Sequence, residues 1–392
     1  MDALMLPLNW QRVRLGDIGK PCMCKRVMKH QTTRYGEIPF YKIGTFGNTA
    51  DAFISKKLFL EYKTKYSFPK KGDILISASG TIGRAVIYDG KPAYFQDSNI
   101  VWIDNDETLV KNDFLFYAYS NVKWNTEHTT ILRLYNDNFR NTLIPLPPLN
   151  EQIAIANILS ALDRYLCALD SLILKKEGVK KALSFELLSQ RKRLKGFNQA
   201  WQRVRLGDIC EFGNGGAYET LIVENGDFKL ISLNSIDIDG NLKNTMKRVN
   251  FYDNSLKQDD IVMVLSDVAH GDFLGLCAVI PSNDYVLNQR MGRLRIRNDC
   301  INILFLRLYI NANQKYFKMQ GQGSSQLNLS KKAIEDFEIL LPPLNEQSAI
   351  ANILSDLDNE ITSLKNKKRQ FENIKKALNH DLMSAKIRVL KK

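Results

Sequence analysis

The chain has 392 residues, a length at which two domains of ordinary size are expected, each with its own hydrophobic core. Hydrophobic residues make up 44% and charged residues 25% of the sequence, which excludes a long disordered chain and a fibrous one. The net charge of +13 makes a polyanionic partner such as nucleic acid a candidate, although an ordinary basic protein would carry the same charge.

The first recognisable element is an opening block, Trp10–Ile18 (WQRVRLGDI), which recurs letter for letter as Trp201–Ile209. Two later blocks also recur, Leu146–Gln152 as Leu341–Gln347 and Ala154–Ser160 as Ala349–Ser355. The offset is 191 for the opening block and 195 for the later blocks, so the intervening segments differ in length while the blocks stay constant. We therefore predict a tandem duplication with a constant frame and diverged interiors.

Each interior is typical of mixed, mostly β structure. Short apolar or β-branched runs bounded by Gly, Asp and Lys predict strands at 38–43, 73–76, 85–88 and 99–103, and at 228–231, 261–265, 278–280 and 294–296. Short helices are predicted at 112–121 and 303–311. Because the runs follow the same order in both interiors, we expect one shared fold with different surface residues.

A long helix is predicted after each Pro-Pro pair. Apolar residues recur with heptad spacing at Ile155, Leu159, Leu162, Leu166, Leu169 and Ile173, and at Ile350, Leu354, Leu357, Ile361 and Leu364. The spacing weakens near Gly178 and Lys368 and then resumes. Each helix of roughly 40 residues would be about 60 Å long.

The apolar seam of each helix needs a partner, and the other copy is the simplest one. We expect an antiparallel coiled coil with a pseudo-twofold axis between the copies, and the alternative is that each helix packs on its own domain. The predicted fold is α+β, with two similar mixed α/β domains in tandem. Their bounds are 1–148 for the first domain, 149–195 for the first helical spacer, 196–343 for the second domain and 344–392 for the second spacer.

A constant frame with two divergent domains suits the reading of two different DNA half-sites at a fixed separation. DNA presents the same face about every 34 Å, so a helical spacer can set the gap between half-sites. A homodimer would instead require a palindrome.

The sequence resembles the type I restriction-modification specificity subunits over nearly its whole length. The resemblance rests on the doubled W-x-x-V-R-L-G-D-I, the doubled P-P-L-x-E-Q before a long helix, and the copy endings at Leu187–Ser189 and Leu382–Arg388. The first copy ends in QRKR at 190–193, which departs from the family pattern and leaves the junction near residue 195 open.

The resemblance implies a sequence-specific DNA-binding subunit with two target-recognition domains and two conserved helical spacers. It also implies assembly with two methyltransferase (M) subunits and with restriction (R) subunits on double-stranded DNA. S-adenosylmethionine, ATP and Mg are then expected in those partner subunits and no cofactor in this chain.

The sequence shows no catalytic constellation of its own. An adenine methyltransferase needs Asn or Asp before its Pro-Pro loop, but Leu146 and Leu341 stand there. No phosphate-binding loop is present, and neither the four histidines nor the close pair Cys22 and Cys24 has metal-site spacing. We expect a non-catalytic protein, and a cytoplasmic one, because the first residues lack the features of a signal peptide.

DNA-reading side chains are expected in loops that combine guanidinium, amide and hydroxyl groups. For each of these residues, a solvated hairpin loop is the alternative. In the first domain the candidates are Ser77, Ser79, Thr81, Arg84, Gln96, Ser98, Asn99, Arg133 and Arg140. In the second domain they are Ser266, His270, Asn288, Gln289, Arg290, Arg293, Gln322, Ser324, Ser325, Gln326 and Asn328, and the amide-rich stretch 321–328 is the strongest of these segments.

The repeated frame offers candidates of another kind. Trp10 and Trp201 are expected to anchor the core rather than to stack on bases. Asn150, Glu151, Asn345 and Glu346 are candidates for docking methyltransferase subunits, with helix capping as the alternative.

Three other functions remain open at this stage. The chain could be the specificity subunit of a related bipartite system in which one polypeptide fuses methylation and cleavage (type IIB-like). It could be a scaffold whose domains bind protein, which would show no salt-dependent DNA affinity. An enzyme site between the domains has the least support, because no acid-base or nucleophile arrangement emerges.

Overall fold

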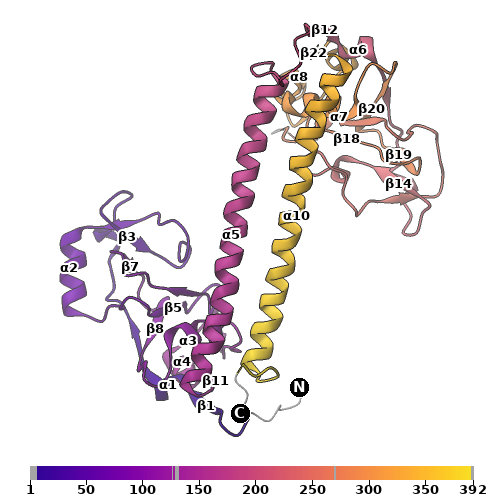
Figure 1. The fold of residues 1–392 in the computed structure, drawn as a ribbon. Helices are drawn as coiled ribbons and strands as arrows, with labels where there is room; N and C mark the ends of the chain where they lie inside the picture. The colour runs from indigo at the N-terminus through magenta and orange to yellow at the C-terminus, as the bar shows by residue number, and fades with distance from the viewer. Residues whose placement is uncertain (1–6, 126, 129–131, 269–270, 390–392) are drawn as a thin grey trace. The chain divides into compact units, whose positions relative to one another are not determined.

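The structure, a computed structural model, describes residues 7–125, 127–128, 132–268 and 271–389. The chain forms two compact units: unit 1 is Met1–Asp170 with Asn366–Lys392, and unit 2 is Ser171–Lys365. Each unit contains one globular domain and a part of both long helices, α5 (Leu149–Leu188) and α10 (Leu344–Met383) (Figure 1). The mixed content of helix and sheet confirms the predicted α+β class.

The domain of unit 1 is built on a four-stranded antiparallel sheet in the order β2-β8-β5-β6 and a three-stranded sheet in the order β4-β3-β7. Two-stranded sheets join β1 to β11 and β9 to β10. Its strands are β1 (Gln11–Arg14), β2 (Gly19–Met23), β3 (Ile38–Tyr41), β4 (Phe53–Ile54), β5 (Ile74–Ser77), β6 (Ala85–Ile87), β7 (Tyr94–Phe95), β8 (Ile100–Asn105), β9 (Glu127–His128), β10 (Leu132–Arg133) and β11 (Leu143–Leu146). Its short helices are α1 (Leu15–Ile18), η1 (Lys29–Gln31), α2 (Lys56–Lys65), α3 (Asn112–Tyr119) and α4 (Asn136–Asn141).

The domain of unit 2 repeats this topology in its four-stranded, three-stranded and β1–β11 sheets and differs in its last two-stranded sheet. Its main sheets run β13-β20-β16-β18 and β15-β14-β19, and two-stranded sheets join β12 to β22 and β17 to β21. Its strands are β12 (Gln202–Arg205), β13 (Cys210–Asn214), β14 (Phe228–Ile231), β15 (Arg248–Val249), β16 (Ile261–Val264), β17 (Ser266–Val268), β18 (Cys277–Val279), β19 (Tyr285–Leu287), β20 (Met291–Ile296), β21 (Gln326–Asn328) and β22 (Glu338–Leu341). Its short helices are α6 (Leu206–Ile209), η2 (Glu219–Leu221), η3 (Leu233–Ser235), α7 (Ile303–Ala312), α8 (Gln314–Gln320) and α9 (Lys331–Glu335).

The shared fold of the two interiors is carried by their central strands. β5 (ILIS) and β16 (IVMV) are buried at every position, and each lies between two neighbours in its main sheet. Apolar runs of this kind are typical of strands covered on both faces. They remain recognisable although the surrounding sequence has diverged, which is why the sequence predicted them.

The opening block closes each domain onto its Pro-Pro block. β1 pairs with β11 in antiparallel register from Gln11↔Leu146 to Arg14↔Leu143, and β12 pairs with β22 in the same way. The leucines that follow, Leu15 and Leu206, are fully buried. The repeated blocks are therefore neighbours in space within each unit.

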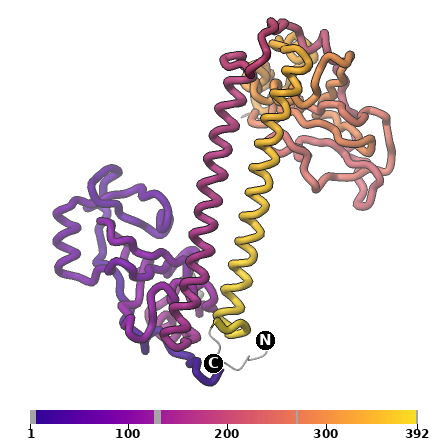
Figure 2. The backbone as a smooth tube through the Cα atoms, in the orientation of Figure 1, coloured from indigo at the N-terminus to yellow at the C-terminus, as the bar shows by residue number. Residues whose placement is uncertain are grey.

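In unit 1 the first half of α5 runs antiparallel to the last part of α10. Asp163 pairs with Lys375, and Asp170 pairs with Lys368 at 2.6 Å. Partners therefore lie earlier in α10 as α5 advances, which is the antiparallel arrangement expected from the pseudo-twofold relation of the two copies. Figure 2 follows both helices along the backbone.

Unit 2 shows the same antiparallel pairing between the remaining parts of the helices. Lys176 contacts Glu360 at 2.8 Å, and Lys180 pairs with Asp358. The helix continues without a break through Gly178, where an added Cβ would meet open space. The weak heptad spacing at this point reflects an exposed face and not an interruption of the helix.

The ends of the helices also pack into the domains. Ile155 and Leu159 at the start of α5 and Leu382 near the end of α10 belong to the hydrophobic core of unit 1. In unit 2, Leu187 and Leu354 occupy the equivalent places. Packing on the helix's own domain, which the sequence offered as an alternative to pairing, thus occurs together with it.

Candidate nucleic-acid interface

Three loops meet in each unit beside the central strand of the main sheet. In unit 1 the backbone N–H of Ala78 donates to Asn99 O at 2.8 Å, and that of Leu134 donates to Ala78 O at 2.9 Å. In unit 2, Leu265 donates to Arg290 O at 3.0 Å, and Leu329 donates to Leu265 O at 2.8 Å. We call these groups the unit 1 loop cluster (77–84, 96–99 and 133) and the unit 2 loop cluster (265–268, 288–290 and 321–328). They contain most of the side chains predicted to read DNA.

Arg133 organises the unit 1 loop cluster. Its guanidinium donates to the hydroxyl of Ser98 at 3.2 Å and to Asn99 Oδ1 at 3.1 Å, and the Ser79 hydroxyl donates to the same Oδ1 at 2.8 Å. Ser98 has a φ of 54°, a left-handed conformation that a short polar residue tolerates in a tight turn. Four of the predicted residues are thus brought together by direct hydrogen bonds.

The remaining residues of the unit 1 prediction differ in exposure. Thr81 and Arg84 are exposed, and Arg84 makes only long contacts of 3.5 Å to Gly47 O and Asn48 Oδ1. The hydroxyl of Ser77 is buried and accepts a hydrogen bond from the N–H of Arg84, and Gln96 accepts one from the N–H of Ile43 at 3.0 Å. Thr81 and Arg84 are therefore free to meet a ligand, whereas Ser77 and Gln96 hold the loops.

Arg140 does not join the unit 1 loop cluster. It lies near the end of α4, and its Cβ is 3.2 Å from the position that a Cβ on Gly16 of α1 would take. The prediction of a DNA contact there is not supported by proximity to the other candidates.

In the unit 2 loop cluster, residues 321–328 form a closed hairpin. The backbones of Gln322 and Asn328 exchange two hydrogen bonds, of 3.0 and 2.9 Å. Gly323 has a φ of 126°, a conformation that favours glycine. Ser324 and Ser325 are exposed between the paired residues. The segment 321–328, the strongest candidate in the sequence, thus presents these hydroxyl groups to solvent.

Two residues predicted to read DNA in unit 2 are instead bound within the protein. Asn288 is 1% exposed, and its amide donates to Glu219 Oε1 at 2.8 Å and accepts from the N–H of Gln289 at 2.9 Å. Arg293 forms an ion pair with Glu211 at 2.5 Å and donates to Ser255 O at 3.2 Å. These contacts suit support of the loops, and a DNA contact of either residue stays a prediction. Gln289 and Arg290 are exposed, and His270 lies outside the described residues.

The two glutamates predicted to dock partner subunits are buried in the frame. Glu151 is 2% exposed, accepts the indole N–H of Trp10 at 3.0 Å, and receives two hydrogen bonds from Arg388, at 2.7 and 2.9 Å. Glu346 is 1% exposed and takes the indole N–H of Trp201 at 3.1 Å and two bonds from Arg193, at 2.9 and 2.6 Å. Both carboxylates are thus enclosed by side chains of this chain, and docking of a partner through them stays a prediction without support from exposure. Both tryptophans anchor the frame, as expected.

The other residues of the repeated motif have separate tasks. Gln152 and Gln347 are 1% exposed, and each joins the start of its long helix to the backbone of its own domain. Gln152 accepts from the N–H of Lys111 and donates to Leu109 O, and Gln347 accepts from the N–H of Asn302. Asn150 and Asn345 are exposed, and each accepts the N–H of the next residue. Docking through the two asparagines stays a prediction.

The sequence reading missed Arg193, Arg388 and the two glutamines as parts of the frame. A signal for them was present, because Arg193 and Arg388 are separated by 195 positions, the same offset that relates Glu151 to Glu346. The ending of the first copy therefore keeps the functional arginine of the second, although its neighbours differ.

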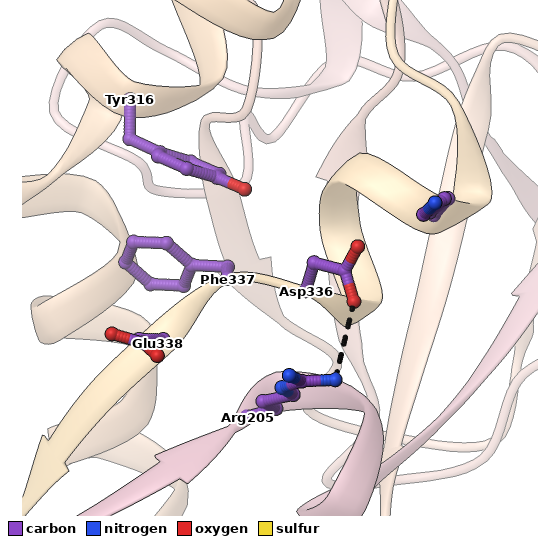
Figure 3. A pocket seen from close by; sticks show the side chains of 6 residues that line it. Arg205, Tyr316, Asp336, Phe337 and Glu338 are labelled. Atoms are coloured by element: carbon purple, nitrogen blue, oxygen red, sulfur yellow. Dashed lines mark ion pairs between the residues drawn. The ribbon is translucent and has the colours of Figure 1, made fainter.

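A hollow of unit 2, shown in Figure 3, lies outside the loop cluster. It is lined by Arg205, Tyr316, Lys332, Asp336, Phe337 and Glu338. Arg205 pairs with Asp336 at 3.7 Å, and the Tyr316 hydroxyl donates to Ala333 O at 3.0 Å. Its lining comes from β12, α8, α9 with the residues that follow it, and β22, and it contains none of the predicted DNA-reading residues. We therefore do not place the interface there.

Two further properties of the described parts of the chain concern metal binding and membrane insertion. Within these ranges no group of three or more His, Cys, Asp or Glu side chains is placed to hold a metal ion. Nor is any helix among them both long and apolar enough to cross a membrane.

Both copies of the repeat are similar to one family of known proteins. The family model described as type I restriction modification DNA specificity domain matches residues 7–176 and 198–373. A putative type I restriction enzyme specificity subunit of Haemophilus influenzae is 62% identical over 152 residues, which are 38% of this chain and 40% of that protein. The MjaVIII specificity subunit of Methanocaldococcus jannaschii is 28% identical over 420 residues, covering 99% of this chain and 95% of that one.

Solved structures share the fold. The S subunit of a type I restriction-modification system from M. genitalium superposes with a TM-score of 0.64 at 19% identity, over 96% of this chain and 98% of that chain. A structure from work on complex assembly and conformational transition of the type I system gives a TM-score of 0.56 at 16% identity, over 97% and 98% of the two chains.

Proposed function

Because the chain belongs to the type I restriction modification DNA specificity domain family, we propose that it is the DNA-reading subunit of a restriction-modification complex. Each unit would read one half of an interrupted, asymmetric DNA sequence. The observation that carries this proposal is the contrast between frame and loops. The two units share one topology and one Trp–Glu–Arg tie, yet their loop clusters present different side chains.

The exposed groups of the two clusters suit different base edges. Unit 1 presents the guanidinium of Arg84 and the hydroxyl of Thr81, whereas unit 2 presents Arg290, the amide of Gln322 and the hydroxyl of Ser324. Arginine pairs best with guanine and amides pair best with adenine in the major groove. Two unlike surfaces favour two unlike half-sites and therefore a sequence that is not a palindrome.

In this proposal the chain recognises DNA and leaves the chemistry to partners. Two methyltransferase subunits would bring S-adenosylmethionine, and restriction subunits would bring ATP and Mg. The exposed Asn150 and Asn345, at corresponding places near the starts of α5 and α10, are candidate contacts for the methyltransferase subunits. The helices α5 and α10 would set the gap between the half-sites, since each contributes residues to both units.

Sequencing of methylated DNA tests the proposal directly. Cells that carry this chain with its methyltransferase are expected to contain N6-methyladenine in one interrupted, asymmetric motif. Deleting the gene for this chain, with the methyltransferase gene left intact, should remove the methylation of that motif. Methylation that persists unchanged after the deletion would sink the assignment.

A further inference from the structure

Unit 2 carries a small two-stranded ribbon, β17 with β21, that forms a sheet of its own. Its antiparallel register pairs Ser266 with Asn328, Asp267 with Leu327 and Val268 with Gln326. Side chains alternate between the faces of a strand. One face of the ribbon therefore carries Ser266, Val268, Gln326 and Asn328, and the other carries Asp267 and Leu327.

The second face is turned into the protein. Asp267 is 4% exposed, and its carboxylate accepts the N–H groups of Val268 and Phe273, both at 2.8 Å. Leu327 packs against the hydrophobic core of unit 2. The first face is consequently the outer one at Val268, Gln326 and Asn328, whereas Ser266 on the same face is 5% exposed.

The outer face contains an apolar side chain that folding does not explain. Val268 is 63% exposed, although it lies in a strand whose other two residues are buried. It stands among polar neighbours, opposite Gln326 and on the same face as Asn328. Cross-strand neighbours have Cβ atoms about 5 Å apart, so the valine methyl groups and the amide can meet one ligand together.

The amide of Gln326 is held in place by the ribbon itself. Its Nε2 donates to the hydroxyl of Ser266 on the neighbouring strand. Within the described ranges no other hydrogen bond engages this side chain, so one N–H and Oε1 are available to a ligand. An amide that offers one donor and one acceptor matches N7 and N6 of adenine, the pair of groups that adenine exposes in the major groove.

We propose that the β17–β21 ribbon enters the major groove and reads adenine and thymine on the same or adjacent base pairs. Gln326 bonds the adenine, and Val268 contacts the C5-methyl group of the thymine. The major groove admits a two-stranded ribbon, and the thymine methyl group is exposed only there. This inference rests on the proposed DNA-reading function and adds the groove, the base pair and a specificity residue.

The matching position of unit 1 carries a different chemistry. There Ser79 forms an isolated antiparallel bridge with Arg133, which stands where unit 2 has Asn328. A guanidinium is suited to guanine rather than to adenine. The contact with the thymine methyl group is therefore assigned to unit 2 alone.

The test uses the chain assembled with its methyltransferase subunits and duplexes that carry the motif mapped by sequencing. Every thymine of the motif is replaced in turn by deoxyuridine, which lacks only the methyl group, and every adenine by 7-deazaadenine, which lacks N7. We expect one thymine at which deoxyuridine weakens binding about fourfold, the value for one buried methyl group. Val268→Ser should abolish that difference, and Gln326→Ala should abolish the effect of 7-deazaadenine at the adenine in question.

Ile238→Ser is the matched control, because Ile238 is 64% exposed in a turn outside the loop cluster and its replacement should leave both differences intact. The inference is overturned if no thymine responds to deoxyuridine in the wild-type complex, or if Val268→Ser responds as strongly as the wild type. Failure of the proposed function looks different, since a complex that prefers no sequence fails before any analogue or variant is tried.

Discussion

Arg388 and Glu151 form a two-bonded ion pair across 237 residues of sequence. Arg193 and Glu346 form the same pair in unit 2, and in each case the arginine comes from the end of the other copy. Each domain is thus closed by a residue that does not belong to its own repeat. The segment after α10 supplies the arginine that binds the buried glutamate of unit 1, and the segment after α5 supplies the one for unit 2.

Replacing Glu346 by Gln is expected to destabilise unit 2 strongly. The change leaves the Arg193 guanidinium without its buried counter-charge, which typically costs about 3 kcal/mol in the free energy of unfolding. Urea unfolding of the purified chain measures it. Glu338→Gln is the control, because the Glu338–Arg203 pair is exposed and should contribute less than about 1 kcal/mol. Equal losses of stability in the two variants would contradict the claim that the buried Glu346–Arg193 pair stabilises unit 2 more than an exposed pair does.

Thiol labelling should follow the two units separately. Burial raises the pKa of Cys24 in unit 1 and of Cys210 in unit 2 to about 12, so both are thiols rather than thiolates at pH 8 and should resist iodoacetamide. Cys300 is exposed and should react in the folded protein. In Glu346→Gln, mass spectrometry should find Cys210 labelled at lower urea than Cys24. Simultaneous labelling of the two would show that the units unfold as one.

The same two thiols give a pH dependence of stability. Their ordinary pKa is 9.0, so above that value the unfolded chain loses protons that the folded chain keeps. The free energy of unfolding should therefore fall as the pH rises from about 9 toward 12. Cys24→Ala and Cys210→Ala, compared with wild type by urea unfolding at pH 8 and pH 10, should each reduce the slope. A slope unchanged in both variants would assign the loss of stability to other groups.

The sequence predicted the frame well and the details of the interiors less well. The repeat rests on blocks of identical sequence, the central strands on apolar runs and the helix pairing on apolar spacing, and all three signals survive divergence of the interiors. Strands of two residues, such as β7, and the ribbon β17–β21 carry no period long enough to detect. Burial of Glu151 was missed because glutamate is almost never fully buried unless it is paired, and its partners Trp10 and Arg388 lie far away in the sequence.

Lengthening both long helices by one heptad should change the gap between half-sites and leave the half-sites themselves unchanged. Insertion in α5 alone, between Leu166 and Ile173, would shift the Lys–Asp pairs of one unit against α10. A matching insertion in α10 after Lys365 preserves the pairing in both units. Seven residues add about 10 Å, or about three base pairs. Sequencing of methylated sites provides the measurement, and a changed half-site would refute the spacer role.

Arg84→Ala should weaken DNA binding, and the pattern of the loss should tell whether Arg84 reads a base or contacts a phosphate. Arg84 is exposed and makes only weak contacts within the protein, so its removal should leave the free energy of unfolding nearly unchanged. If Arg84 reads a base, the loss should be about 1–3 kcal/mol and confined to one motif position. If it contacts a phosphate, affinity should fall for all sequences and the salt dependence should decrease by about one ion. No effect on affinity would remove Arg84 from the interface.

The ties made by Trp10, Glu151, Gln152 and Arg388, and by their counterparts in unit 2, are confined to one another and to the ends of elements. Among the described residues, none of the hydrogen bonds of these ties reaches a residue of a loop cluster. Changes inherited in the loops can therefore accumulate without loosening the scaffold. A lineage of such proteins could acquire a new DNA target one unit at a time while each intermediate still folds.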